Sequence, residues 1–310
     1  MNPAGDEVER LIDRLNTLRE GSSAVAGLVA CGGRAIEPLR RFLLDGKPSG
    51  IFQPRQRAVE ALARLGAKEV LIEYLAREQE IPDPVDRHGE EAVASTAARL
   101  LAGWRDEETS QFLMGLLSRK PLPGLLAAMG ELRRAEAIPE LIGALGDDFD
   151  RPFAEEALGK LGEAAHPALV AAARTARPSV DEETPVSRSR RRASLRLLTG
   201  LKLSSADWRV LSALAEDRDR EIAAHANWIA LAVAEKGEKK RAARRLVRML
   251  PHTSWALQIE IERWLAAEAD LARAVIDEEI ARRRAAIGDE PKDEKLQRLL
   301  ALKRKIGRKV

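Results

Sequence analysis

The side chains best suited to bind an ionic partner are basic and lie in the C-terminal part of the chain. A run of arginines interleaved with serines, SRSRRR, occupies residues 187–192, and a second basic cluster covers residues 236–248. Lys240, Arg244 and Arg248 recur every four residues, so a helix would place them on one face. Such a face attracts phosphates or acidic proteins, whereas the alternative is an ordinary solvated surface. The candidate binding residues are Arg188, Arg190, Arg191, Arg192, Lys239, Lys240, Arg244, Arg245, Arg248 and Trp255.

Trp255 joins this set because it lies near an expected helix start, beside His252 and Ser254. The other tryptophans of this half, Trp208, Trp228 and Trp264, lie on apolar helical faces and are expected to pack inside the protein. The serines of the arginine run also allow a second interpretation. Phosphorylation there would add negative charge beside the arginines and regulate a contact.

Residue combinations typical of catalysis or metal binding are missing from the sequence. The four histidines are far apart, and none has zinc-ligand spacing to a cysteine or to another histidine. Asp147, Asp148 and Asp150 cluster, but they lack the glycine and distal glutamate of a calcium loop, so we expect them to cap a helix that begins near Arg151. Cys31 lies in an apolar run and is expected to be packed. We therefore predict no catalytic residue, no metal ligand and no cofactor.

The charge is distributed unevenly along the chain. Residues 1–180 carry 23 Lys and Arg against 28 Asp and Glu, whereas residues 181–310 carry 29 against 21. The overall net charge of +3 conceals this difference. The basic part could attract nucleic acid, an anionic membrane surface or an acidic protein.

The elements that would position these residues are short paired helices. In residues 150–174, Phe153, Leu158 and Leu161 follow helical spacing, Gly162 ends the helix, and Pro167 suits the start of a second helix. Related stretches occupy residues 61–75, 99–117 and 125–145. Their aligned positions recur at a period of roughly thirty residues, which is typical of helical solenoids. Leu101, Met129 and Leu158 are three such aligned positions.

With this repeat, the chain resembles the HEAT-repeat superfamily, in particular the short bacterial type named after phycobilisome lyases. The resemblance is strongest from about residue 24 to residue 175 and fades beyond it. It implies an all-α fold, a right-handed α-α superhelix with about eight helical hairpins. It also implies that the second helices line the concave face, with Arg40, Arg41, Glu73 and Glu140 exposed there.

The pattern predicts one solenoid in five consecutive parts. A capping helix precedes the regular repeats, and a charged loop with the acidic residues Asp181, Glu182 and Glu183 separates them from longer, basic repeats that carry the tryptophans. A basic helix or tail ends the chain. The expected ranges are 1–21, 22–175, 176–194, 195–288 and 289–310.

The resemblance leaves several functions open. HEAT-like deoxyhypusine hydroxylases bind iron through His-Glu pairs, but no His-Glu dipeptide occurs here. Bilin lyase-like subunits share the repeat alone. HEAT-like alkylpurine DNA glycosylases use tryptophans, an aspartate and a basic groove, but their motif cannot be matched residue by residue. The sequence favours a non-enzymatic scaffold that binds a protein partner through a concave groove and the basic C-terminal half, with nucleic-acid binding as the alternative.

The remaining composition indicates where such a protein works. The chain has no apolar stretch of the roughly eighteen or more residues that a membrane helix needs, and its start, MNPAGDEVERLIDRL, is charged where a signal peptide would be apolar. A single cysteine cannot form an internal disulfide. We therefore expect a soluble, cytoplasmic, bacterial protein.

Overall fold

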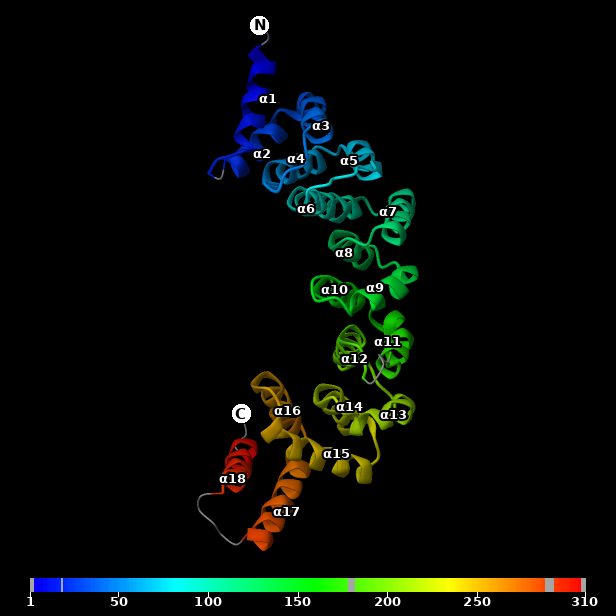
Figure 1. The fold of residues 1–310 in the computed structure, drawn as a ribbon, viewed down its shortest axis with the longest axis vertical. Helices are drawn as coiled ribbons and strands as arrows, with labels where there is room; N and C mark the ends of the chain where they lie inside the picture. The colour runs from blue at the N-terminus through cyan, green and yellow to red at the C-terminus, as the bar shows by residue number, and fades with distance from the viewer. Residues whose placement is uncertain (1–2, 18, 178–181, 288–292, 308–310) are drawn as a thin grey trace. The chain divides into compact units, whose positions relative to one another are not determined.

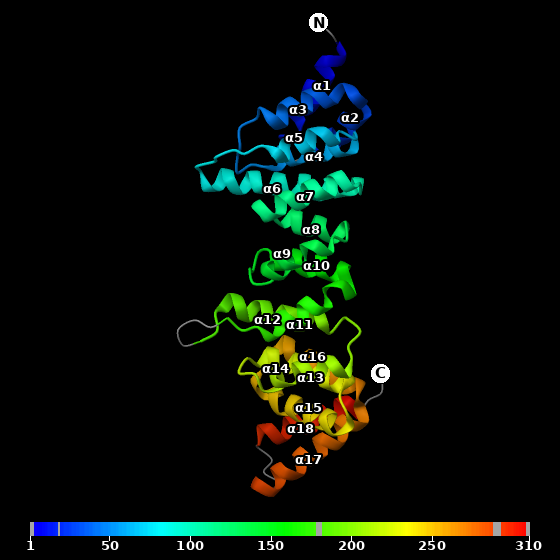
Figure 2. The same cartoon turned by 90° about the vertical axis from the view of Figure 1, so that its right-hand side faces the viewer.

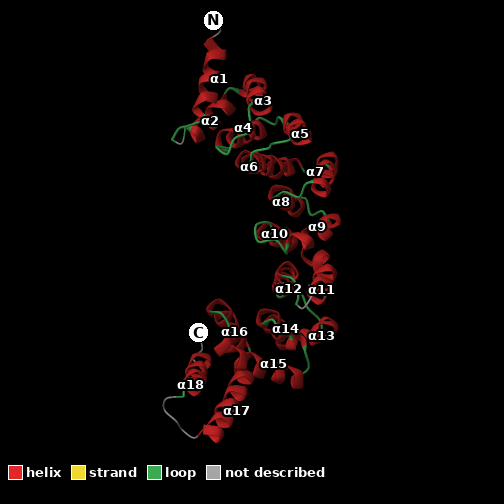
Figure 3. Cartoon of the chain, viewed as in Figure 1, coloured by secondary structure: helices red, strands yellow, loops and turns green. Residues whose placement is uncertain are grey.

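A computed structural model describes residues 3–17, 19–177, 182–287 and 293–307. The described residues are mostly helical and contain no β-strand, which confirms the predicted all-α fold (Figure 3). In chain order from α2, the helices α2 to α17 of these ranges make eight consecutive pairs, in line with the about eight hairpins that the resemblance implies. The chain divides into two compact units, Met1–Leu161 (unit 1) and Gly162–Val310 (unit 2), so the division falls inside the regular repeats and not at residue 175.

Unit 1 begins with a single helix that covers one end of its hairpins. Helix α1 packs on α2 and α3 and buries Val8 and Ile12, although it ends at Arg14, earlier than predicted. The helices of unit 1 are α1 (Pro3–Arg14), α2 (Gly21–Ala30), α3 (Ile36–Leu44), α4 (Gln53–Arg64), α5 (Lys68–Ala76), α6 (Pro84–Leu101), α7 (Glu107–Arg119), α8 (Pro123–Glu131), α9 (Ile138–Ala144) and α10 (Arg151–Leu161).

The first and second helices of the unit 1 hairpins form two rows (Figures 1 and 2). The first helices α2, α4, α6, α8 and α10 each pack on the next, whereas successive second helices touch each other much less. Glycines permit the close packing of the first row. A Cβ at Gly124 on α8 would lie 1.9 Å from the carbonyl oxygen of Ser95 on α6, and one at Gly130 would lie 2.6 Å from the Cα of Ala157 on α10.

The prediction that second helices line the concave face is wrong for unit 1. The more closely spaced row of a curved stack lies on its inner side, and in unit 1 this is the row of first helices. Of the residues expected on the concave face, Arg40 on α3 instead forms a salt bridge with Glu73 on α5 at 2.6 Å, and both belong to the second-helix row. At α8 the physical reason is that Gly124 and Gly130 carry no Cβ, so α6 and α10 can approach its backbone closely.

The hairpin turns share one backbone feature. In the turns after α2, α4, α6, α8 and α10, one residue has a positive φ: Gly32, Gly66, Arg105 and Arg133 in unit 1, and Gly162 at the start of unit 2. At Arg133 the backbone N–H of Arg134 donates to the carbonyl of Met129 at 3.0 Å, and at Gly66 that of Ala67 donates to Leu62 at the same distance. This six-to-one bond satisfies a free helix carbonyl.

The apolar interior follows the predicted repeat. The aligned positions Leu101, Met129 and Leu158 are all buried. A polar network also ties hairpins together, because Arg55 on α4 donates to the carbonyl of Leu43 at 2.7 Å and pairs with Glu90 on α6. Tyr74 on α5 donates to the same glutamate at 2.6 Å.

Most helices of unit 2 are longer than most of those in unit 1, although α11 and α13 are short. Helix α11 packs on α12, α14 on α15, α15 on α17, and α17 on α18. The helices of unit 2 are α11 (His166–Arg174), α12 (Pro185–Leu198), α13 (Ser205–Leu211), α14 (Arg220–Val233), α15 (Lys236–Met249), α16 (Trp255–Ala267), α17 (Ala269–Ile287) and α18 (Glu294–Gly307). None of the helices described in either unit combines the length and apolarity needed to span a bilayer.

The structure corrects the predicted loop at residues 176–194. Helix α12 starts at Pro185, and the arginine-serine run begins two residues later, at Ser187. The hydroxyl of Thr184 accepts from the backbone N–H of Ser187 at 3.2 Å, so a threonine cap and a proline in the first turn start the helix where composition suggested a loop. Asp181 lies outside the described residues, and so do residues 289–292 and 308–310 of the predicted tail.

Candidate functional site

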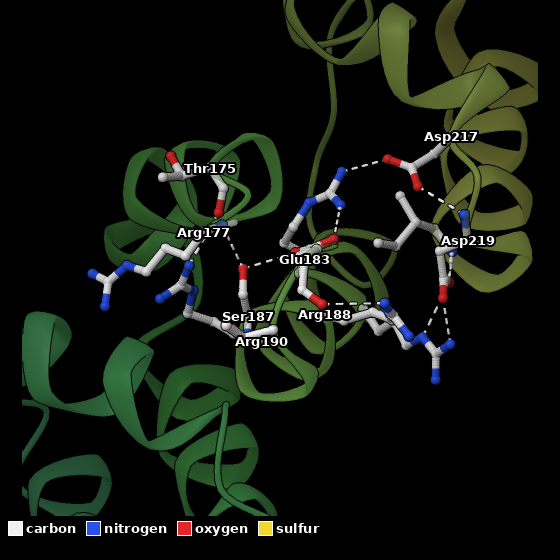
Figure 4. A network of polar contacts seen from close by, with 12 residues as sticks. Thr175, Arg177, Glu183, Ser187, Arg188, Arg190, Asp217 and Asp219 are labelled. Carbon is white, nitrogen blue, oxygen red and sulfur yellow. Dashed lines mark hydrogen bonds and ion pairs between the residues drawn. The ribbon is translucent and has the colours of Figure 1, made fainter. Parts of the chain in front are cut away.

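The arginines of the SRSRRR run were predicted to contact a partner, but two of them are buried. Arg190 and Arg191 are 6% and 4% exposed. Arg191 donates to the carbonyl of Ala173 at 2.9 Å, to the carboxylate of Glu183 at 2.7 Å and to that of Asp217 at 2.5 Å. Figure 4 shows this network, in which α12 is joined to the segments that flank it.

Burial lowers the pKa of the Arg191 guanidinium, but the hydrogen bonds and charges of Asp217 and Glu183 more than offset this and raise the pKa above its usual value. Arg190 has no such partner, and its side chain donates to the carbonyl of Thr175 at 3.0 Å. Burial lowers the pKa of Arg190. Both side chains are therefore committed to the interior of unit 2.

The remaining two arginines of the run are partly exposed and also have partners. Arg192 donates through Nε to Asp219 at 3.0 Å, and Asp219 also caps α14 by accepting from two backbone N–H groups at 3.1 Å. Burial raises the pKa of Asp219, but the bond and charge of Arg192, together with the backbone N–H groups of Ile222 and Glu221, outweigh it and the net pKa is lowered. Arg188 lies 3.8 Å from Glu182 and donates to the carbonyl of Glu183 at 3.2 Å.

The basic cluster on α15 is paired in the same way. Lys240 and Arg244 both meet Glu278 on α17 at 2.5 Å, and Arg248 meets Glu279 at 2.7 Å. Arg245 pairs with Glu216. Lys239 donates to the carbonyl of Ala232 at 3.2 Å, and its Nζ lies 4.0 Å from the carboxylate of Glu268. Each cation predicted to bind a partner on α15 thus has an acidic neighbour within unit 2, which reduces the positive potential of this face.

Trp255 is the predicted site residue that projects into solvent. Its side chain is 77% exposed at the start of α16. Trp208 and Trp264 are buried, as expected, and Trp208 donates through Nε1 to Glu238 at 2.6 Å. The structure thus separates Trp255 from the tryptophans that hold unit 2 together.

A groove that the sequence did not indicate lies on the first-helix row of unit 1. It has a volume of about 930 Å³ and is lined by α6, α8, α10 and the turn after α6. Leu100, Ala127 and Phe153 supply apolar surface, and Phe149 stands at its edge with 72% of its surface exposed. The rings of Phe149 and Phe153 lie 6.5 Å apart in a tilted arrangement, which is a favourable aromatic geometry.

The aspartate cluster holds Phe149 in this position. The carboxylate of Asp147 accepts from the backbone N–H of Phe149 at 2.8 Å and from that of Asp150 at 3.0 Å, just before α10 begins. The cluster therefore orders a turn, close to the capping role predicted for it. Sequence reasoning missed the groove because Phe149 lies among acidic residues and breaks the apolar periodicity.

The rim of the groove carries both signs of charge. Lys160 bridges Glu131 at 2.5 Å and Glu156 at 2.6 Å, which joins α10 to α8. The pKa of Glu131 is lowered first by Lys160 and further by the charge of Arg105. Among the described residues, no three His, Cys, Asp or Glu side chains gather as a metal site would require. The groove therefore offers apolar contact and discrete charges.

The comparisons with known proteins add two distant structural likenesses. No protein-family model and no curated protein sequence matches the chain. One similar solved structure is the complex of CpcE and CpcF of phycocyanin lyase from Nostoc sp., with 15% identity and a TM-score of 0.38 over 77% of this chain and 94% of that chain. Another is human deoxyhypusine hydroxylase in complex with glycerol, with 17% identity and a TM-score of 0.32 over 88% and 98%. Neither likeness carries an activity or a partner to this chain, and the HEAT-like architecture stands on the paired helices themselves.

Proposed function

We propose that this HEAT-like protein is a scaffold that binds a partner protein through the groove formed by α6, α8 and α10. The observation that supports this most is Phe149, a large aromatic side chain left 72% exposed beside an apolar groove. Leaving such a surface in water is unfavourable, and burying it against a partner releases free energy in proportion to the apolar area covered.

The chemistry of the groove fits a protein segment with large apolar side chains. Aromatic anchors in concave surfaces are typical centres of protein interfaces. Among the polar groups at the rim, Lys160 forms salt bridges with Glu131 and Glu156, and such pairs suit the polar edge of an interface. The proposed interface is centred on unit 1, although the sequence directed attention to the basic half of the chain.

A photo-crosslinking experiment tests the proposal. A photoreactive phenylalanine analogue replaces Phe149 in the full chain, in the native cells, and crosslinked peptides are identified by mass spectrometry. The same analogue at Trp255 provides the comparison, because that side chain is equally exposed in unit 2. We expect a defined partner segment with large apolar residues to be captured at position 149.

A second variant separates groove binding from chance proximity. Leu100→Asp places a charge in the groove at a partly exposed position, so the capture at position 149 is expected to disappear while the fold persists. Capture at position 255 alone, or capture at 149 that is indifferent to Leu100→Asp, contradicts the proposed function.

A further inference from the structure

Four arginines of unit 1 differ from the other cations around them. Arg64, Arg99, Arg105 and Arg133, here called the turn arginines, lie at the hairpin-turn ends of the first helices and are exposed. Within the described ranges, their side chains form no salt bridge or hydrogen bond with a carboxylate; Arg105 only influences Glu131 through space. By contrast, Arg40, Lys68, Arg134 and Lys160 all hold acidic partners at 3.0 Å or less.

The turn arginines line the groove and two further hollows that share lining residues with it. Arg64 and Arg99 line a hollow of about 740 Å³ between the ends of α4 and α6, and Arg99 also lines the groove. Arg105 lines the groove and a further hollow of about 510 Å³, which it shares with Arg133. Each of these hollows thus shares an arginine with the groove, Arg99 in one case and Arg105 in the other.

Two of these arginines occupy positions where their backbone is strained. Arg105 has φ of 55° and Arg133 has φ of 51°, although Gly32, Gly66 and Gly162 fill the same place in other turns. A residue with a Cβ is disfavoured in this conformation, whereas glycine adopts it freely. Strain of this kind is commonly found where the side chain has a function beyond the fold.

We propose that the turn arginines bind carboxylates of an acidic segment that flanks the apolar residues of the partner. This rests on the proposed function, and it assigns the partner its charge: large apolar side chains fill the groove while Asp or Glu residues beside them meet the arginines. A guanidinium offers a planar pair of donors that matches a carboxylate, so each contact adds orientation as well as attraction.

The surroundings favour an acidic protein over a nucleic acid. Glu60, Glu107 and Glu131 line the same hollows, and residues 1–180 carry a net charge of −5, from 23 basic and 28 acidic residues. A nucleic acid presents closely and regularly spaced phosphates, which these carboxylates would repel. An acidic peptide can place its carboxylates at the arginines alone and offers apolar side chains to the groove.

Random peptides displayed on phage and selected on the full chain test this inference. Enriched peptides are expected to combine large apolar residues with neighbouring Asp or Glu. Synthetic versions, followed by fluorescence anisotropy, should bind about tenfold more weakly to the double variant Arg105→Gly/Arg133→Gly. Because glycine suits both turns, this variant should melt no lower than the parent. Arg41→Ala is the matched control, because Arg41 is an exposed arginine on α3 outside the groove and the two hollows.

The outcomes separate this inference from the proposed function. Peptides that depend on Phe149 but bind the double variant unchanged, or that lack acidic residues, overturn the acidic partner and leave the groove in place. Absence of enrichment, or peptides indifferent to Phe149→Ala, overturns both. A single-stranded DNA probe that binds the parent and is lost in the double variant replaces the acidic protein by a nucleic acid.

Discussion

Arg191 on α12 of unit 2 and Arg133 in the α8–α9 turn of unit 1 show two opposite uses of the same side chain. Arg191 is buried and its guanidinium bonds Glu183, Asp217 and a backbone carbonyl. Arg133 is exposed, strained at its backbone and has no carboxylate bonded to it among the described residues. The first arginine stabilises its unit, whereas the second is available to a partner.

The comparison shows why the density of basic residues was a poor guide. The crowded arginines and lysines of α12 and α15 meet acids that are remote in sequence, such as Asp217, Glu278 and Glu279. Among the described residues, the turn arginines Arg64, Arg99, Arg105 and Arg133 bond no carboxylate. Whether a cation is available thus depends on what the neighbouring hairpin brings opposite it.

The largest expected effect comes from Arg191→Met. The change leaves Glu183 and Asp217 without their shared partner in a partly buried site, and breaking such a pair costs about 3–5 kcal/mol. Tryptophan fluorescence during urea unfolding follows it, because four of the five tryptophans lie in unit 2. Arg188→Ala, on the same helix but partly exposed, should cost less than about 1 kcal/mol. Equal losses in the two variants would remove the distinction drawn for α12.

A smaller loss is expected in unit 1 from Gly130→Ala. The added Cβ would meet the Cα of Ala157 at 2.6 Å, so α8 and α10 must separate at a cost of about 1–3 kcal/mol. Hydrogen exchange of α8 and α10, measured by mass spectrometry, reports this locally. Gly115→Ala on α7, which has open space around it, should instead gain up to about 1 kcal/mol. A tolerated alanine at position 130 would contradict the close packing of the first-helix row.

Adding and removing a Cβ at the left-handed turn position should change stability in opposite directions. Arg133→Gly relieves a left-handed residue and is expected to leave stability unchanged or raise it by up to about 1 kcal/mol. Gly66→Ala introduces a Cβ at φ of 75° and should lower stability by about 1 kcal/mol. Thermal unfolding followed by circular dichroism measures both. Loss of stability in Arg133→Gly would mean that this arginine, like Arg191, serves the fold.

The smallest expected effect on stability at neutral pH comes from substituting His225 on α14. Burial lowers the pKa of this imidazole, which donates from Nδ1 to the carbonyl of Glu221 at 2.8 Å and lies against Trp264. Below about pH 6.5 the unfolded chain binds a proton that the folded chain resists, so the stability of unit 2 should fall as the pH falls. The carboxylate of Glu260, 3.7 Å from Nε2, partly offsets the lowering of the His225 pKa. Urea unfolding of His225→Phe between pH 7 and pH 5 should show a shallower decline than the parent, and identical slopes would exclude His225 as the cause.

The sequence predicts the hairpins well because their signals are local. Leu101, Met129 and Leu158 recur with the repeat, and Gly66 and Gly162 end their helices where the pattern places them. The start of α12 was misjudged because charge composition outweighed the Thr184 cap and Pro185. The groove could not be predicted, since it depends on how closely α6, α8 and α10 pack, and that depends on glycines meeting backbone atoms from another repeat.

The left-handed residue in the turns after α2, α4, α6, α8 and α10 has a consequence for how such a protein can change. The five positions, Gly32, Gly66, Arg105, Arg133 and Gly162, meet the same backbone requirement with different side chains. Added Cβ atoms at the three glycines would touch nothing within 4 Å. The left-handed turn position can thus accept different side chains. Substitutions there can change the exposed surface one repeat at a time, at a modest conformational cost, while the interior stays as it is.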